Sequence, residues 1–332
     1  MKKIAKYVVY IVIGVIVIIA GAVSYITLAL PDVGKPENIK IAATPQQIER
    51  GKYLTLHVSA CLDCHSPHDW SKFGGPVDTT QLGAGGQKFD AGVGFPGDVI
   101  VPNITPHHLS NWTDGEIFRA ITTGVKKDGS AIFPLMPWQY YAKMDRADIY
   151  AIIAYLRTLK PVNTDHPKAR LDFPLNILVH TMPEKATLGN KPQLSDTIKY
   201  GEYMVQSAAC KDCHSQDEKG KLLPGLVFAG GKQYTVNGNT LRSANITPDK
   251  ETGIGTWTKA QFIARLKLFN DESKATSVNK TDFQTIMPWW DYSGMSDDDL
   301  GAIYAYLKTV EPVKNQVVKF QVNSLAPIAS SK

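Results

Sequence analysis

The sequence carries one short cysteine motif twice, and this pair constrains the fold more than any other feature. The copies are Cys61-Leu62-Asp63-Cys64-His65 and Cys210-Lys211-Asp212-Cys213-His214. Two cysteines three residues apart, followed at once by histidine, are typical of c-type haem: both thiols bond to the porphyrin edge and the imidazole reaches the iron. The sequence therefore predicts two haem c groups. Their attachment points are Cys61, Cys64, Cys210 and Cys213, and their first axial iron ligands are His65 and His214.

Other uses of paired cysteines fit poorly. A zinc site needs two cysteine pairs close together, or one pair with a distant histidine pair, and these pairs lie almost half a chain apart. A thioredoxin-like motif belongs to a strand-to-helix turn in a βαβ pattern, which surrounds neither copy. The motifs use all four cysteines of the chain, so no disulfide is expected.

The N-terminal segment predicts a membrane anchor. Residues 7–30 carry no charge and would span roughly 36 Å as a helix, against about 30 Å for the hydrocarbon core of a bilayer. Ala20-Gly21-Ala22 is a weak cleavage site for a signal peptide, and apolar sequence continues beyond it. Three preceding lysines place the N-terminus in the cytoplasm. We expect a single-pass protein of the bacterial inner (cytoplasmic) membrane with periplasmic haem domains.

Charge argues against a nucleic-acid partner. The formal net charge is +5, and the lysines that precede the apolar segment supply three of these charges. The remainder of the chain is therefore close to neutral, and no strongly basic patch is indicated.

The two motifs belong to a longer internal repeat, whose period near 150 residues suits two complete domains. The order of the matched motifs is the same in both copies. They are Gly51-Lys52-Tyr53 with Gly201-Glu202-Tyr203, Ala84-Gly85-Gly86 with Ala229-Gly230-Gly231, Asn103-Ile104-Thr105-Pro106 with Asn245-Ile246-Thr247-Pro248, Trp112 with Trp257, Met136-Pro137-Trp138 with Met287-Pro288-Trp289, and Ala154-Tyr155-Leu156 with Ala305-Tyr306-Leu307. The predicted organisation is an anchor (1–30), a tether (31–45), a first copy (46–165), a linker (166–194), a second copy (195–315) and a C-terminal tail (316–332).

Each copy is predicted to begin and end with a helix. The helices that lead into the haem motifs cover about 45–58 and 196–207. The last helices have apolar residues at i, i+3, i+4 and i+7, with N-caps at Asp145 and Ser296 and a proline just past each end. Between them we expect long loops and a hairpin at Asn237-Gly238.

The stretch from Pro161 to Gln193, which includes the linker, carries five prolines and no helical period. We expect it to lie semi-extended along a domain surface, because its apolar side chains require burial. These are Leu171, Phe173, Leu175, Ile177, Leu178 and Val179. The tail after Val313 alternates weakly and is expected to pack in the same way.

The far side of each iron decides the chemistry, because a thioether or a second imidazole suits electron transfer and an open position invites oxygen or peroxide. His214 is the only histidine after His180, so a local second ligand there must be a methionine. Met287 precedes a proline on a loop from which the chain can turn back to the iron. We therefore predict Met287, and by the repeat Met136, as the second axial ligands.

The remaining candidates are given other roles. Met295 and its counterpart Met144 directly precede the last helices and are predicted to be apolar staples, and Met204 is predicted to pack in the core. Four histidines compete for the first iron, but their aligned counterparts in the second copy are not histidine. They are His57, His68, His107 and His108. Ligation of the first iron by two histidines therefore stays an alternative to Met136.

These motifs make both copies resemble class I cytochrome c domains, and more closely the repeats in cytochrome subunits of membrane-bound alcohol, aldehyde and sugar dehydrogenases. The specific marks are Asn245 to Asp249, Thr252 to Trp257, Met287-Pro288 and Ala305-Tyr306-Leu307. The resemblance covers roughly 46–162 and 196–313. It implies a mainly α fold, with two tandem class I cytochrome c domains of helices and long loops wrapped on haem, after an N-terminal transmembrane helix.

The resemblance also implies roles for single residues. Gly51 with Tyr155, and Gly201 with Tyr306, would meet where the first and last helices cross, since glycine permits close approach. Four further residues would lie near the haem propionates: Asn103, Trp112, Asn245 and Trp257. Two departures limit the carry-over of partners. The dehydrogenase subunits usually contain three such domains, and the first copy lacks the Thr-Gly-Ile-Gly run before its tryptophan.

Together these features favour electron transfer over catalysis. Two haems on an anchored chain would relay electrons between a respiratory donor, such as a quinol-oxidising complex or a dehydrogenase, and a terminal acceptor such as an oxidase. A permanent, noncatalytic place in a larger membrane complex is a variant of this hypothesis. The alternative is a dihaem enzyme, a peroxidase or thiosulfate-type oxidoreductase, which would need one iron with an open or unusual ligand.

Overall fold

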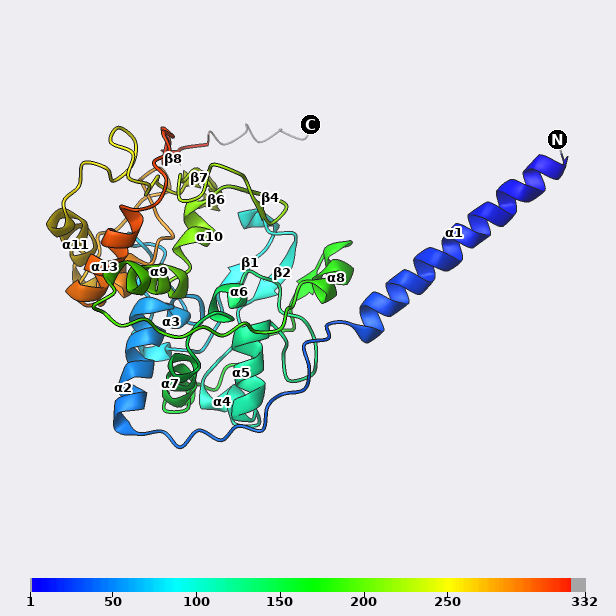
Figure 1. Cartoon of the computed structure of the whole chain (residues 1–332), viewed down its shortest axis with the longest axis horizontal. Coiled ribbons are helices and arrows are strands. Elements are labelled where there is room, and N and C mark those ends of the chain that lie inside the picture. Colours follow the sequence, from blue (N-terminus) through cyan, green and yellow to red (C-terminus); the bar gives the residue numbers. More distant parts are fainter. Residues whose placement is uncertain (1, 324–332) are drawn as a thin grey trace, which may run out of the picture.

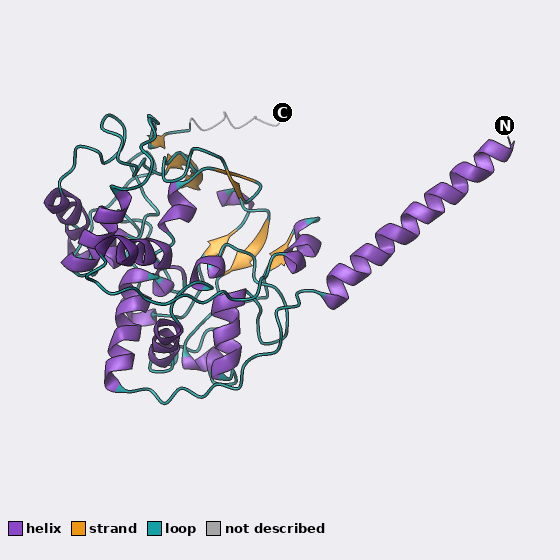
Figure 2. Cartoon of the chain, in the orientation of Figure 1, coloured by secondary structure: helices purple, strands orange, loops and turns teal. Residues whose placement is uncertain are grey.

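The structure is a computed structural model that describes residues 2–323, so the predicted tail is outside the described residues from 324 onward. Helices dominate it, and the strands are short (Figure 2). The α-helices are α1 (Lys2–Ala29), α2 (Pro45–Tyr53), α3 (Cys61–Cys64), α4 (Pro106–Leu109), α5 (Asp114–Thr123), α6 (Trp138–Tyr141), α7 (Arg146–Leu156), α8 (Leu175–Leu178), α9 (Thr197–Ser207), α10 (Cys210–His214), α11 (Lys259–Lys267), α12 (Trp289–Tyr292) and α13 (Asp297–Leu307).

The shorter elements lie between these helices. The π-helix η1 (Leu54–Val58) and the 3-10 helices η2 (Thr79–Gln81), η3 (Ala91–Val93), η4 (Val179–Thr181) and η5 (Glu272–Lys274) are single turns. The strands are β1 (Lys88–Phe89), β2 (Gly97–Ile100), β3 (Arg170–Leu171), β4 (Asp217–Glu218), β5 (Lys221–Leu222), β6 (Gln233–Val236), β7 (Asn239–Arg242) and β8 (Phe320–Gln321).

Most of the first helix stands clear of the rest of the molecule, and its last turns contact α8 and η4 (Figure 1). None of its 28 residues is fully buried, and it is long and apolar enough to cross a membrane. A signal sequence near an N-terminus has the same properties. The predicted apolar helix is confirmed, and its role as an anchor remains a proposal.

The first and last long helices of each copy pack against each other, α2 on α7 and α9 on α13. At both crossings a glycine permits the approach: a Cβ atom on Gly51 would lie 1.8 Å from the Ala151 carbonyl oxygen, and one on Gly201 would lie 2.0 Å from that of Ala302. Any larger residue would collide with backbone. The predicted glycine crossings are confirmed.

The last helices begin at the predicted caps. The Asp145 side chain accepts a hydrogen bond from the Ala147 amide, and the Ser296 side chain accepts one from the Asp299 amide. Met144 and Met295, directly before these caps, are buried, as predicted for staples. Met204 is also fully buried in the core, as predicted.

The helix predicted for 45–58 changes its winding part of the way along. It runs as α2 to Tyr53 and continues as η1, closed by a bond from the Ser59 amide to the Leu54 carbonyl at 2.8 Å. The equivalent α9 is regular from Thr197 to Ser207. A π turn at this point adds a local bend just before the first haem motif.

Three small antiparallel sheets tie the loops together. The predicted hairpin at Asn237-Gly238 is confirmed: Val236 pairs with Asn239, and both turn residues have positive φ angles. The linker joins one sheet through β3, where Arg170 pairs with Asp98, and the tail joins another through β8, where Phe320 pairs with Leu241. Linker and tail therefore lie along the body, as expected.

Burial of the linker is incomplete. Val179 is buried, and Leu171, Leu175 and Ile177 are half-buried. Phe173, however, is 79% exposed and Leu178 is 42% exposed. The prediction that all of these side chains find cover on the protein was therefore wrong for these two, which point away from the surface that covers their neighbours.

The tether between α1 and α2 is held along the first copy. Glu37 forms an ion pair with Arg146 at 2.7 Å, and the Ile41 amide donates to the Asp114 carboxylate at 2.9 Å. Gly115 allows the chain to pass closely, because a Cβ there would lie 1.8 Å from the Glu37 carbonyl oxygen. The segment from α1 to α2 is thus attached to the body by specific contacts.

Candidate haem sites

Both cysteine motifs form short helices, α3 and α10, which begin after an unusual backbone conformation. Ala60 and Ala209, the residues before the first cysteines, have φ angles of 45° and 50°. Left-handed backbone costs free energy for a residue with a Cβ atom, and it persists where the surroundings require it, often at functional sites. Both copies hold the motif in this same way.

Each motif histidine is oriented by a backbone carbonyl. Nδ1 of His65 lies 2.8 Å from the Pro102 oxygen, and Nδ1 of His214 lies 2.7 Å from the Ala244 oxygen. A ring nitrogen facing a carbonyl must carry its proton there, which leaves the Nε2 lone pair for a metal. Burial lowers the pKa of both histidines and so favours the neutral, metal-binding form. The residues present therefore fit an axial haem ligand in each copy.

The double-glycine motif packs directly on these histidines. The Gly85 amide donates to the His65 carbonyl at 2.8 Å, and the Gly230 amide donates to the His214 carbonyl at the same distance. A Cβ on Gly85 would lie 2.4 Å from the Val101 oxygen, so only glycine fits. The repeated Ala-Gly-Gly sequence therefore closes the loop that holds the imidazole.

The first cysteine of each motif lies in surroundings that disfavour a free thiolate. Burial raises the pKa of Cys61 and of Cys210 to about 12. In the part of the chain that the structure describes, no group of three His, Cys, Asp or Glu side chains could hold a metal ion. The chemistry of the cysteines is that expected for thioether formation.

The side chains of the asparagines predicted near the propionates form hydrogen bonds to other residues of the protein. The Asn103 carbonyl accepts bonds from the amide and hydroxyl of Thr105, and its NH₂ group donates to the carbonyls of Val162 and Thr164. Asn245 repeats this pattern with Thr247 and Val313. Both amides thus fasten the Asn-Ile-Thr-Pro loop to the segment after the last helix.

The tryptophans predicted in the same region are half-buried, and their backbone carbonyls are bound within the fold. The Trp112 carbonyl accepts from Arg157 at 2.5 Å, and that of Trp257 accepts from the Tyr304 hydroxyl at 2.6 Å. Neither indole N–H donates to any residue between 2 and 323, so both donors are free for a bound group. Contact of all four residues with propionates stays a prediction.

The two methionines predicted as second ligands lie in matching turns. The Trp138 amide donates to the Met136 carbonyl at 2.7 Å, and the Trp289 amide donates to the Met287 carbonyl at 2.7 Å. Both side chains are only partly buried, unlike Met144, Met204 and Met295. The distinction between ligand and packing methionines therefore agrees with burial, while ligation itself stays a prediction.

Three of the four competing histidines have a ring nitrogen in contact with another group. Both nitrogens of His68 lie 2.5 Å from backbone oxygens, of Gly75 and of Asp63. Nδ1 of His57 lies 3.0 Å from the Asp291 oxygen. His107 lies 3.3 Å from Asp165, at the surface. Only His68 has both ring nitrogens engaged, whereas His57 keeps its Nε2 open, so a second histidine at the first iron stays an alternative to Met136.

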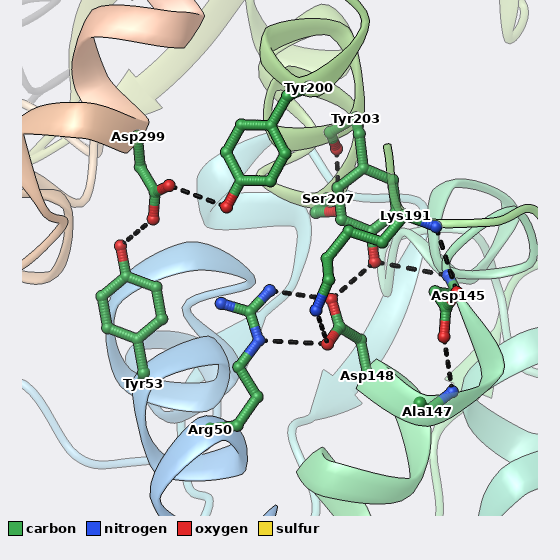
Figure 3. A network of polar contacts seen from close by, with 10 residues as sticks. All are labelled: Arg50, Tyr53, Asp145, Ala147, Asp148, Lys191, Tyr200, Tyr203, Ser207 and Asp299. Atoms are coloured by element: carbon green, nitrogen blue, oxygen red, sulfur yellow. Dashed lines mark hydrogen bonds and ion pairs between the residues drawn. The ribbon is translucent and has the colours of Figure 1, made fainter. Parts of the chain in front are cut away.

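A reciprocal contact between the two copies is a feature that the sequence reasoning missed (Figure 3). The Tyr53 hydroxyl donates to Asp299 of the second copy, and the Tyr203 hydroxyl donates to Asp148 of the first copy at 2.7 Å. Each hydroxyl also accepts from the backbone at the start of the same helix, from the Ser296 amide and the Asp145 amide respectively. Each copy therefore caps the last helix of the other.

The contact follows a pseudo-two-fold axis, because Tyr53 is equivalent to Tyr203 in the repeat and Asp148 is equivalent to Asp299. Within its own copy, Asp148 binds Arg50 at 2.8 Å and Asp299 binds Tyr200 at 2.8 Å (Figure 3). The sequence shows that the tyrosine of each Gly-x-Tyr motif and the third residue of each last helix are polar groups repeated in register, but it does not show that they meet across the two copies.

The same pseudo-symmetry brings the haem motifs to the interface. The Tyr141 hydroxyl donates to the Ser59 carbonyl, and the Tyr292 hydroxyl donates to the Ala208 carbonyl, so each methionine loop is fixed to the chain that leads into its own motif. Across the interface, His57 contacts the Asp291 carbonyl. Its equivalent Gln206 donates to the Tyr140 carbonyl at 3.4 Å.

Two buried carboxyls lie where the first motif meets the second copy. Burial raises the pKa of Asp63 in the first motif and of Asp291 in the second copy, and the charge of Asp63 raises the pKa of Asp291 further. The first motif therefore lies beside the second copy.

Comparison with known proteins agrees with this site. No family model matches the chain. It is 27% identical over 281 residues to the cytochrome c subunit of a quinone alcohol dehydrogenase from Gluconobacter oxydans, covering 80% of this chain and 55% of that protein. It is 26% identical to the fructose dehydrogenase cytochrome subunit of Gluconobacter japonicus, covering 79% and 52%. The chain thus spans about half the length of these relatives.

A third relative is matched along nearly its whole length. A diheme cytochrome c-type protein of Cereibacter sphaeroides is 25% identical over 310 residues, which is 90% of this chain and 97% of that protein. The fold and the paired sites suit a protein that holds two c-type haems. The chain is similar to cytochrome c subunits of dehydrogenases and to a dihaem cytochrome c, which confirms the resemblance and supports c-type haem as its cofactor.

Proposed function

We propose that the protein is a membrane-anchored dihaem cytochrome c that relays electrons on the periplasmic side of the inner membrane. Its donor would be a quinol-oxidising complex or a dehydrogenase, and its acceptor a terminal oxidase or a similar respiratory partner. The observation that carries the proposal is that the segment leading into each haem motif contacts the other copy, through His57 and through Gln206. A relay requires such proximity, and two independent sites would not.

In each copy, different residues would hold different parts of the haem. Two cysteines attach the porphyrin, and the motif histidine binds one side of the iron with its ring fixed by the Pro102 or Ala244 carbonyl. Met136 and Met287 would bind the other sides. Haem held by histidine and methionine supplies reversible one-electron chemistry at relatively high potential. Asn103, Trp112, Asn245 and Trp257 belong to the loops that would lie around the propionates.

The relatives support assembly with a larger complex. Several of them are named as cytochrome subunits of alcohol, fructose or gluconate dehydrogenases. We propose that this chain likewise serves as the cytochrome subunit of a membrane complex, with α1 as its single span. Purification in mild detergent should then recover stoichiometric protein partners, detected together with haem staining. Recovery of the chain alone would favour a free shuttle.

The ligand assignment has a direct spectroscopic test. The ferric protein should show a sulfur-to-iron charge-transfer band, and Met136→Leu and Met287→Leu should each remove about half of its intensity. Met144→Leu and Met295→Leu are matched controls, since these side chains are buried staples and their loss should leave the band unchanged. A wild-type band of half intensity, with carbon monoxide binding to the reduced protein, would instead indicate a dihaem enzyme with one open iron.

A further inference from the structure

The linker exposes two large apolar side chains at a place where the fold could have covered them. Phe173 is 79% exposed and Leu178 is 42% exposed, although Val179 beside them is buried. Both belong to the segment from Leu171 to Met182, which we call the linker patch and which contains α8 and η4. Large apolar side chains left exposed within one short segment are candidates for an interaction surface.

The linker patch lies against the end of α1. Both α8 and η4 contact α1, and Figure 1 shows α8 on the side of the body from which α1 leaves. Nδ1 of His180 lies 3.2 Å from the Leu30 carbonyl oxygen. Within α1, from Lys2 to Ala29, only Val23 and Ile26 are partly covered. With Leu30 they form one stripe along the helix, so the patch covers its last two turns.

This position corresponds to the boundary of a bilayer. The uncharged stretch that ends at Leu30 is roughly 6 Å longer than a hydrocarbon core of about 30 Å. Val23 lies about 10 Å from Leu30 along the helix, towards the membrane centre. An element that packs on this stripe therefore reaches the depth of the headgroups and the first part of the acyl chains, where aromatic side chains are favoured.

We propose that the linker patch is a second membrane contact, in which Phe173 and Leu178 insert shallowly into the lipid beside α1. The inference rests on the anchored orientation in the proposed function. Lipid is the occupant that the geometry favours, because the patch is continuous with the span. Two side chains also offer little of the roughly 1,200–2,000 Å² that a stable protein interface buries.

A second contact would fix how the haem-bearing body stands over the membrane. The patch is attached to the first copy through the pairing of β3 with β2, and the tether is attached through Glu37 and Arg146. A body held by one helix can swing, whereas one held by a helix and an adjacent inserted segment keeps a single face towards the lipid. The linker patch would thereby determine which haem edge meets a membrane-bound donor.

The test is photo-crosslinking of the full-length haem protein. Phe173 is replaced by p-benzoylphenylalanine, and the protein is irradiated both in native membranes and in nanodiscs of phosphatidylethanolamine and phosphatidylglycerol. Val15, on α1, is the positive control. Leu268 is the matched negative control, because it is 67% exposed and follows α11, on the side of the body away from α1 (Figure 1). Mass spectrometry identifies lipid adducts, and haem staining follows each variant.

We expect lipid adducts from positions 173 and 15, with a yield at 173 severalfold above that at 268. Lipid adducts at 15 together with none at 173, or with protein adducts at 173, overturn the second contact and leave the anchor intact. A soluble haem protein without adducts at 15 overturns the anchor and the second contact together. Loss of haem from the wild-type chain overturns the relay while the crosslinking result still stands.

Discussion

At the scale of single residues, Asp148 holds more of the structure together than any other carboxylate described here. Its side chain is 2% exposed and binds Arg50 of its own copy, Tyr203 of the other copy, and Lys191 of the linker. Burial works to raise the pKa of Asp148, but the hydrogen bond and positive charge of Arg50 outweigh it and hold this pKa below its ordinary value.

The sign of the pH dependence follows. A carboxyl with a lower pKa in the folded state stabilises the fold fully above its unfolded pKa, near 4, and this contribution is lost as pH falls through the folded value. We expect Asp148→Asn to cost about 3 kcal/mol of unfolding free energy at pH 7, because it leaves Arg50 without its charged partner. The difference from wild type should shrink below pH 4 in denaturant titrations. A difference independent of pH would contradict the role of this charge.

At the scale of secondary-structure elements, the helix crossings depend on glycine residues, which have no side chain to keep the two backbones apart. Gly201→Ala would place a Cβ atom 2.0 Å from the Ala302 carbonyl oxygen, where backbone must move. Gly301→Ala is a matched control on α13, because its Cβ would meet only the flexible end of Lys259. We expect the first change to lower the thermal midpoint strongly and the second to leave it within a few degrees. Equal effects would argue against the crossing as the cause.

Elements of local origin could be predicted, and those that depend on tertiary contacts could not. Caps at Asp145 and Ser296 and the turn at Asn237-Gly238 depend on neighbouring residues alone, so their sequence signals were sufficient. The π turn after Tyr53 had a signal that the prediction did not use, because Cys61 lies ten positions after Gly51 and Cys210 lies nine after Gly201, and a π turn accommodates one extra residue. The exposure of Phe173 was not predicted, because the prediction assumed that apolar side chains are buried only against other residues of the protein.

At the scale of the whole molecule, the copies join through contacts that are each present twice. The sequence revealed the repeat but not its mode of association, since nothing in Tyr53 or Tyr203 shows which copy its hydroxyl will reach. The candidate haem motifs could be proposed from sequence because covalent attachment of haem fixes the spacing of the two cysteines and the histidine. The interface between the copies depends on a three-dimensional arrangement that this spacing does not encode.

The paired tyrosines allow a test of that interface. Tyr53→Phe and Tyr203→Phe each remove one hydroxyl that bridges the copies, and each should cost about 1 to 2 kcal/mol of unfolding free energy because a buried carboxylate loses a donor. The double variant should also slow electron exchange between the haems, measured by flash photolysis. Tyr155→Phe is the control, because its hydroxyl bonds to no residue among 2–323. Unchanged exchange in the double variant would show that other contacts position the haems.

The doubling of these bonds points to the history of the chain. A surface that is its own complement is what a homodimer possesses, and gene fusion would convert such a dimer into one polypeptide while keeping every contact in two versions. After such a fusion, the residues of each contact can change independently of those in its repeat. Arg50 and Tyr200 stand at equivalent positions of the repeat. One binds its carboxylate as a cation and the other as a neutral phenol, so the two copies have diverged at this position.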